Sequence, residues 1–333
     1  MSTKSLRTAS FAPLNLLAVS AALLCASAAQ AAPGHLPVSS DGSMALPLTQ
    51  AAQPAAGFKG LLRPGVALDA DSEFAAERLS ADELARFNAT YKPKLPPYAV
   101  EQGDNGTESV INDDRRFRVY PQESGYPYRA VGLLTFTQGS GNYTCTAWLI
   151  SPDTLATAGH CVHSGGAGGV WSTNVRFYPG RNGASSPYGS CTSKRLNSVN
   201  GWVSSANDQY DYGSVKLNCT VGNTTGWLGR WWTTASQANL PIMIVGYPGD
   251  KPSSTQWGGA GRVALSETRK TRYAVDTAGG QSGAPVIQAD GSGVCQGDCG
   301  IAIHAYGNSG GNNSGTRITE TVNANLQTWI NTP

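Results

Sequence analysis

The sequence contains little charge of either sign. Only 14% of its 333 residues are Asp, Glu, Lys or Arg, and the formal net charge is +2. Residues 109–333 hold 12 acidic and 16 basic residues, a net charge of +4, which is too weak to indicate a polyanionic partner. The chain also has no basic run suited to nucleic acid and no internal repeat. We therefore expect no nucleic-acid partner and no repeat architecture.

The sequence also lacks an apolar run long enough to span a bilayer. Its most apolar stretch, FAPLNLLAVSAALLC at 11–25, is short and broken, and it follows Lys4 and Arg7. The residues AQA at 29–31 then fit the cleavage site of an export signal. A buried N-terminal helix is the alternative. We predict that residues 1–31 are a signal peptide, that the protein is secreted, and that it has no membrane partner.

Six cysteines remain after the predicted signal peptide, an even number in an oxidising compartment, so disulfides are expected. We favour sequential pairing because each pair then brackets a single loop or hairpin. The expected bridges are Cys145–Cys161, Cys191–Cys219 and Cys295–Cys299. A zinc site is the alternative, but the C-x3-C spacing at 295–299 departs from the usual zinc pair, and no second pair with histidines follows.

Residues 32–108 contain no cysteine and no tryptophan. They hold ten acidic and six basic residues, a net charge of −4. The stretch KPKLPPYAVEQGDNGTE at 92–108 is rich in Pro and Gly and should be an exposed, cleavable join. An acidic segment before a basic one with disulfides predicts a pro-region that shields the protein behind it, with an independent small domain or linker as the alternative. His35 lies in this segment, and we expect no catalytic role for it.

Residues 109–333 have the pattern of a β protein. Short apolar or alternating runs, such as YRAVGLLTF at 128–136, lie between clusters of Gly, Asn, Ser and Pro. Many short strands with irregular loops favour a sandwich or a barrel. Only 319–331 looks helical, with Thr319 as its cap and Trp329 on its apolar face.

Two motifs supply the groups that nucleophilic catalysis needs. The stretch LATAGHC at 155–161 ends an apolar strand at His160, directly before a cysteine. The stretch DTAGGQSGAPV at 276–286 places Ser282 in a glycine-dense turn. The flanking glycines let the N–H groups of Gly280 and Ser282 point into one space, as an oxyanion site requires. A Gly-Ser turn alone is usually only a turn, so the serine also needs a base and an acid that orients it.

The orienting acid is expected in NDQYDYGSVKL at 207–217. Asp208 and Asp211 both qualify by residue type. We favour Asp211, because it leads directly into the strand YGSVKL and so lies at a fixed, partly buried position. The chain order is then histidine, aspartate, serine, the order of chymotrypsin-type enzymes.

The stretches TAWLISPDTLATAGHCV, YDYGSVKL and GGQSGAPV together resemble the chymotrypsin superfamily, in particular the bacterial glutamyl endopeptidases. The similarity begins near SVINDDRRFRV and covers residues 109–333. It implies two antiparallel six-stranded β-barrels, at about 109–225 and about 226–318, with the active site in the cleft and a Cys145–Cys161 bridge that pins the loop of His160. It also implies a serine endopeptidase that acts on polypeptides. We expect a monomer, and neither a metal nor an organic cofactor, because this chemistry needs none.

The resemblance also predicts the specificity. His304, on the strand GIAIHAYG, occupies the place of a histidine that lines the family's pocket and meets a glutamate carboxylate, and Thr277 assists it. An imidazole and a hydroxyl can pair with a carboxylate and hydrogen-bond it. We therefore predict cleavage after Glu and, less readily, after Asp. The family also uses the mature α-amino group as a positive contact, and Glu108 before Ser109 offers a site for self-release.

Alternatives to a glutamate-specific protease remain, and the sequence departs at one position from the digestive enzymes. Asp276 lies six residues before Ser282, where trypsin-like enzymes carry the acid that binds Arg or Lys. Gln281 replaces the aspartate that pairs with the freed N-terminus in digestive enzymes, so that N-terminus must act elsewhere, and we expect it at the pocket. A non-catalytic binding homologue or a surface adhesin could use the same scaffold. His163 is expected to be a solvated loop residue.

Overall fold

The structure is a computed structural model. It describes residues 33–43, 53–60, 92–93, 110–111, 113–120, 125–289, 298–309 and 311–333. The predicted signal peptide 1–31, the predicted cleavage site Glu108–Ser109 and Cys295 lie outside the described residues. The extent of the signal peptide and of the pro-region, and the bridge Cys295–Cys299, therefore stay predictions.

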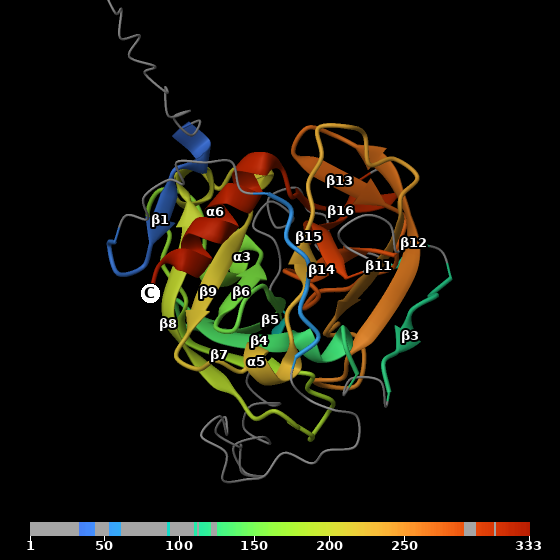
Figure 1. Ribbon diagram of the computed structural model, residues 1–333, viewed down its shortest axis with the longest axis horizontal. Coiled ribbons are helices and arrows are strands. Elements are labelled where there is room, and N and C mark those ends of the chain that lie inside the picture. The colour runs from blue at the N-terminus through green and yellow to red at the C-terminus, as the bar shows by residue number, and fades with distance from the viewer. Residues whose placement is uncertain are drawn as a thin grey trace, which may run out of the picture. The chain divides into compact units, whose positions relative to one another are not determined.

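The first barrel consists of six antiparallel strands in the order β8-β7-β4-β5-β6-β9, and β9 pairs again with β8 to close it (Figure 1). Its strands are β4 (Val131–Gln138), β5 (Gly141–Leu149), β6 (Thr154–Thr157), β7 (Thr173–Pro179), β8 (Cys191–Val199) and β9 (Gly213–Leu217). The interior is filled by large apolar side chains that are fully buried, among them Leu134, Phe136, Trp148 and Phe177. The expected disulfide Cys191–Cys219 is formed beside this barrel.

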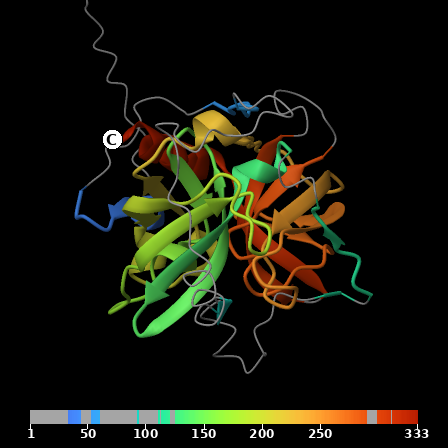
Figure 2. The same cartoon turned by 90° about the horizontal axis from the view of Figure 1, so that it is seen from below.

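The second barrel repeats this plan in the order β15-β14-β11-β12-β13-β16, and β16 closes on β15. Its strands are β11 (Pro241–Gly246), β12 (Trp257–Ser266), β13 (Lys270–Tyr273), β14 (Pro285–Gln288), β15 (Cys299–Ser309) and β16 (Asn312–Arg317). Figure 2 shows the green and yellow first barrel beside the orange and red second one. The fold is therefore the predicted pair of six-stranded barrels.

Four shorter strands pair with the barrels. β1 (Pro37–Ser39) pairs with β8, β2 (Lys92–Pro93) with β5, β3 (Phe117–Arg118) with β12, and β10 (Gly229–Arg230) with β15. β1 and β2 come from the predicted pro-region. These two strands thus extend the sheet of the first barrel.

The chain ends in helix α6 (Glu320–Asn331), as the sequence predicts. Thr319 caps it by accepting the Val322 N–H at 3.3 Å. The buried face includes Trp329, whose ring lies 5.9 Å from the ring of Tyr212, the residue after Asp211. The helix therefore supports the segment that carries the expected catalytic acid. In the described part of the chain, no helix is long and apolar enough to cross a membrane.

We expect Trp329→Ala to lower the free energy of unfolding by about 3 kcal/mol, because it leaves a cavity under α6. Chemical denaturation followed by far-UV circular dichroism would measure the change. Asn331→Ala, on the exposed end of the same helix, is the matched control and should change stability by less than about 0.5 kcal/mol. Equal effects of the two substitutions would show that Trp329 does not anchor the helix.

Candidate active site

His160 lies on α3 (Gly159–Val162), the short helix that follows β6, and it is fully buried. The next residue, Cys161, forms the expected disulfide with Cys145 on β5. Gly159 is required by packing, because a Cβ at this position would lie 2.9 Å from Asp211 Oδ1. The bridge and the glycine together fix His160 against β5 and next to Asp211.

Asp211 uses both carboxylate oxygens to hold His160. Its Oδ2 lies 2.7 Å from His160 Nδ1, and its Oδ1 accepts the backbone N–H of His160 at 2.8 Å. Asp208, the other candidate acid, is half exposed and pairs with Lys270 at 3.1 Å. The structure thus brings Asp211, and not Asp208, to the histidine.

The charge of Asp211 is stabilised although the residue is fully buried. Burial alone would raise the pKa of Asp211, but the charge of His160 and the hydrogen bonds from His160 and Tyr306 outweigh it, so the pKa lies below its usual value. An ionised Asp211 holds the proton of His160 on Nδ1. His160 Nε2 is buried and has no hydrogen-bond partner among the described residues, so it is the ring nitrogen that can accept a proton.

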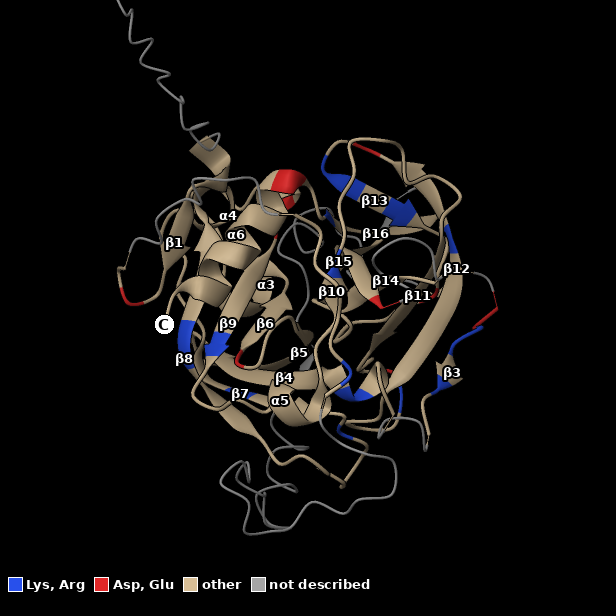
Figure 3. Cartoon of the chain, in the orientation of Figure 1, with Lys and Arg blue, Asp and Glu red and all other residues tan. Residues whose placement is uncertain are grey.

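Tyr306 is a second donor to Asp211 that the sequence reasoning missed. Its hydroxyl donates a short hydrogen bond to Asp211 Oδ2. The Lys270 ammonium lies 4.0 Å from the centre of the Tyr306 ring. Lys270 lies on β13, a strand that Figure 3 shows to be rich in basic residues. Nothing local in the sequence marks Tyr306, because an aromatic residue on an apolar strand usually belongs to the core.

The turn of Ser282 packs directly against the first barrel. Ser282 O accepts the Thr146 N–H at 2.8 Å, and Thr146 Oγ1 donates to Gly280 O at 2.9 Å. Gly283 has φ of 87°, and a Cβ there would lie 2.1 Å from Thr146 O, so only glycine permits this approach.

This packing places the Ser282 carbonyl beside the disulfide that neighbours the histidine. Thr146 is next to Cys145 in the chain, and the bridge partner of Cys145 is next to His160. Cys161 Sγ lies 3.8 Å from Ser282 O. The nucleophile candidate of the second barrel and the base candidate of the first therefore meet at one disulfide.

Backbone hydrogen bonds fix the turn around Ser282. The N–H groups of Gln281 and Gly283 donate to Ala278 O and His304 O, at 3.0 and 2.6 Å. The Gly280 N–H donates no hydrogen bond within the described residues. Gly280 has φ of 101°, and a Cβ there would lie 2.5 Å from Tyr247 O. The turn thus fixes Gly280 while keeping its N–H available.

The two expected pocket residues are both fully buried. His304 lies on β15, where its Nδ1 is 2.6 Å from the hydroxyl of Tyr273, so the ring is held in one orientation. Thr277 Oγ1 has no hydrogen-bond partner among the described residues. A buried hydroxyl without a partner is costly in the free protein, and a bound ligand could satisfy it.

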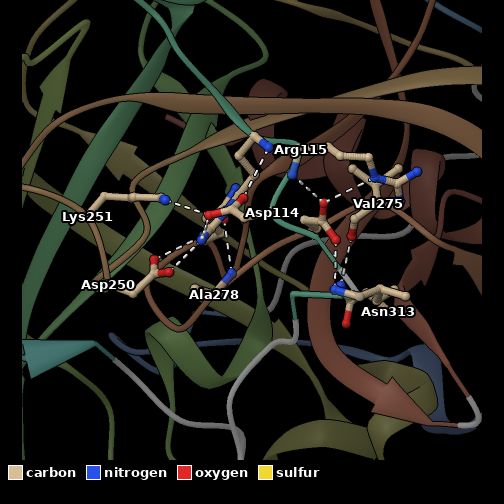
Figure 4. A network of polar contacts seen from close by, with 11 residues as sticks. Asp114, Arg115, Asp250, Lys251, Val275, Ala278 and Asn313 are labelled. Atoms are coloured by element: carbon tan, nitrogen blue, oxygen red, sulfur yellow. Dashed lines mark hydrogen bonds and ion pairs between the residues drawn. The ribbon is translucent and has the colours of Figure 1, made fainter.

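Asp276 faces the segment that follows the predicted cleavage site. Its Oδ1 accepts the Ile111 N–H at 2.7 Å and its Oδ2 accepts the Arg115 N–H at 2.9 Å (Figure 4). Arg115 Nε lies 3.6 Å from Oδ2. The carboxylate that a trypsin-like pocket would present to a substrate is therefore bonded to backbone of the same chain.

A second network holds the same segment. Arg116, whose side chain is fully buried, donates to Asp114 at 2.9 Å and to Asp250 at 3.0 Å, and Lys251 bonds Asp114 (Figure 4). Gly249, next to Asp250, donates its N–H to Gly279 O at 2.6 Å. The segment 113–118 is thus tied to the loop that supports the serine turn.

The prediction for His163 was wrong, because the structure buries it. Its Nδ1 accepts the Gly165 N–H at 3.0 Å, and its ring packs edge-on against Trp171 with 4.9 Å between the centroids. Burial lowers the pKa of His163. It is a neutral core histidine that shapes the loop after α3.

The sequence and the fold of this chain are similar to those of known peptidases. Residues 145–294 match the trypsin-like peptidase domain. A glutamyl endopeptidase of Bacillus licheniformis is 44% identical over 242 residues, which cover 72% of each chain. A protein of Bacillus subtilis named extracellular metalloprotease is 41% identical over 226 residues, 67% of this chain and 70% of the relative. A solved Glu endopeptidase in complex with MPD matches with a TM-score of 0.59 at 28% identity, over 67% of this chain and 100% of that one.

The two barrels and the matched domain define a serine endopeptidase of the chymotrypsin-like class. The chain belongs to the bacterial glutamyl endopeptidase family.

The name of the Bacillus subtilis relative raises the question of a metal. In the described part of this chain, one group of three candidate ligands lies within 4.8 Å, formed by Cys145, His160 and Cys161. Both sulfurs are joined in the disulfide, so neither can act as a thiolate ligand. These residues do not fit a metal site.

We expect Asp276→Asn to lower the free energy of unfolding by about 1–2 kcal/mol, because the amide replaces one of the two acceptors of backbone N–H groups by a donor. Thermal unfolding would measure the change. Asp113→Asn, an exposed position in the same segment, is the control and should have little effect. An unchanged melting temperature for Asp276→Asn would show that the bonds to Ile111 and Arg115 do not hold the segment.

Proposed function

We propose that the protein is a secreted endopeptidase that cleaves polypeptides after Glu and, less readily, after Asp, through His160, Asp211 and Ser282. The observation that carries this proposal is the orientation of His160 by both oxygens of Asp211. It leaves Nε2 without a partner among the described residues, and the turn of Ser282 lies against Cys161, the residue after His160. The names of the relatives support the substrate class.

The chemistry follows from these positions. His160 Nε2 takes the proton of the Ser282 hydroxyl as the oxygen attacks the scissile carbonyl. The N–H groups of Gly280 and Ser282 stabilise the oxyanion, and the imidazolium is stabilised by the ionised Asp211. His160 then protonates the leaving amine and an acyl-enzyme forms. Water, activated by the same histidine, releases the product acid.

Specificity for Glu is proposed to come from His304 and Thr277. The Tyr273 hydroxyl orients the His304 ring through Nδ1, and Thr277 offers an unsatisfied buried hydroxyl. A substrate carboxylate would pair with the imidazole and accept a hydrogen bond from the threonine. The alternative pocket acid, Asp276, is already bonded to backbone N–H groups.

The mature N-terminus is proposed to contribute to the same pocket. Ile111 bonds Asp276, the neighbour of Thr277, and lies two residues after Ser109, the predicted first residue of the mature chain. Cleavage between Glu108 and Ser109 would therefore release an α-amino group close to the pocket. Its positive charge would favour a carboxylate ligand.

Digestion of an unstructured protein, with cut sites read by mass spectrometry, tests the specificity. We expect cuts mainly after Glu, because the pocket pairs with a carboxylate. His304→Gln should lower kcat/KM for Glu substrates by about 100-fold, since it removes a charge-assisted bond. Asp276→Asn should leave the preference for Glu intact. Predominant cleavage after Arg or Lys, lost in Asp276→Asn, would instead establish the trypsin-like alternative.

Substitution of the two candidate acids tests the triad. Asp211→Asn should lower kcat by about 10³–10⁴-fold, because the amide stabilises neither the required tautomer nor the imidazolium. Asp208→Asn should change kcat by less than about threefold, because Asp208 is half exposed, pairs with Lys270 and makes no contact with His160. Steady-state hydrolysis of a Glu-containing chromogenic peptide measures both. A larger loss for Asp208→Asn than for Asp211→Asn would contradict the assignment.

A further inference from the structure

Two stretches of the predicted pro-region, residues 33–43 and 53–60, pack on the barrels, and we call them the N-terminal clamp. They lie to either side of helix α6 (Figure 1). The clamp contacts three sites on the rest of the chain. These are the edge of β8, the slot between Tyr212 and α6, and the segment 227–230.

The first place is the edge of β8. Strand β1 pairs with it in antiparallel register, from Pro37 opposite Val199 to Ser39 opposite Asn197. Backbone bonds continue on both sides, with the Ser40 N–H donating to Leu196 O and the Asn200 N–H to Leu36 O, both at 2.9 Å. β7 pairs with β8 only at residues 191–192. β1 thus supplies backbone partners where β7 has turned away.

The second place is a slot beside the candidate catalytic acid. His35 is buried, and its Nδ1 lies 2.9 Å from the hydroxyl of Tyr212, the residue after Asp211. Asn325 of α6 donates both to that hydroxyl, at 2.8 Å, and to His35 O, at 2.9 Å. The His35 ring packs edge-on against Tyr210 at 4.8 Å. Burial, with the charge of Arg269, lowers the pKa of His35 to about 4, so the docked imidazole is neutral at pH 7.

The third place is the segment 227–230. Phe58 and Trp227 exchange two backbone hydrogen bonds, both at 2.8 Å, and their rings lie 4.4 Å apart. Ala55 and Arg230 exchange two more, at 2.8 and 2.7 Å. Gly60 has φ of 79°, and a Cβ there would lie 2.3 Å from Thr224 O.

We propose that the N-terminal clamp is a docking partner of the protease in its own right, and that it stays bound without a covalent link after the chain is cut behind it. Its occupancy supports α6 and Tyr212, and through Tyr212 the backbone next to Asp211. The clamp is therefore a stable second chain, in addition to its predicted role as part of a pro-region. This inference does not depend on specificity for Glu.

The physical basis is strand addition at two sites of one ligand. Backbone pairing gives affinity, and the contacts of His35 with Tyr212 and of Phe58 with Trp227 give register. Because residues 44–52 link the two stretches, docking of one raises the effective concentration of the other. Release would exchange the backbone bonds at the edge of β8 for bonds to water and would expose the rings of Tyr210 and Tyr212 that His35 contacts.

The test uses the full chain with Ser282→Ala, so that no self-cleavage occurs, and with the recognition sequence of a specific protease in place of residues 102–107. After cleavage by that protease, native gel filtration at micromolar concentration should show the N-terminal fragment eluting with the barrels. Separate elution of the two fragments would overturn the proposal.

Exchange of synthetic peptides of residues 33–60 into the cut complex tests the docking geometry. The wild-type peptide should displace the bound fragment. Gly60→Ala should bind at least about tenfold more weakly, because its Cβ meets the Thr224 carbonyl. Gly42→Ala is the matched control: Gly42 has a similar φ of 75°, but a Cβ there meets nothing within 4 Å, so binding should be nearly unchanged. Equal binding of the three peptides, or no exchange by any of them, would contradict the proposed docking.

Discussion

The packing of the serine turn against the first barrel is the contact on which the site depends. Gly283 allows the turn to approach within contact of Thr146, and Thr146 binds the carbonyl groups of Ser282 and Gly280. The disulfide at the neighbouring Cys145 holds the histidine helix at the same point. A side chain at position 283 would force the two barrels apart here, and with them the candidate nucleophile and the candidate base.

The second constraint is a buried negative charge. Asp211 is fully buried, and burial of an isolated carboxylate is unfavourable. Three donors stabilise it, namely the ring and the backbone N–H of His160 and the hydroxyl of Tyr306. The charge is thereby retained where it can orient the imidazole. The N-terminal clamp does not contact Asp211 itself. It contacts the next residue, Tyr212, whose hydroxyl is bonded by His35 and by Asn325 of α6.

Much of this arrangement could be predicted from the sequence. The alternation of short apolar runs and turn residues indicated a sandwich or a barrel, and the resemblance to the chymotrypsin superfamily implied two barrels. The motifs around His160 and Ser282 located two candidate groups. The contacts that could not be predicted join residues far apart in the chain. The sequence around Tyr306 indicates only a core aromatic residue. Its contact with Asp211 forms only when the second barrel has folded and β15 lies beside the first barrel. His163 lies two residues after Cys161 and was expected to be a solvated loop residue. Its burial depends on the contact with Trp171, which the sequence does not indicate.

The contact between Asp276 and residues 111–115 also joins parts of the chain that are far apart in the sequence, so the sequence could not predict it. Asp276 was a plausible substrate-binding acid in the sequence, and only the path of residues 111–115 shows that its carboxylate bonds backbone. The most direct measurement is a crystal structure of the protein inactivated by a peptide phosphonate with a Glu side chain at the reacting position. Our account predicts phosphorus bound to Ser282 Oγ, a phosphonyl oxygen at the Gly280 and Ser282 N–H groups, and the carboxylate against His304. A Ser282 Oγ beyond hydrogen-bond reach of the His160 ring would contradict it.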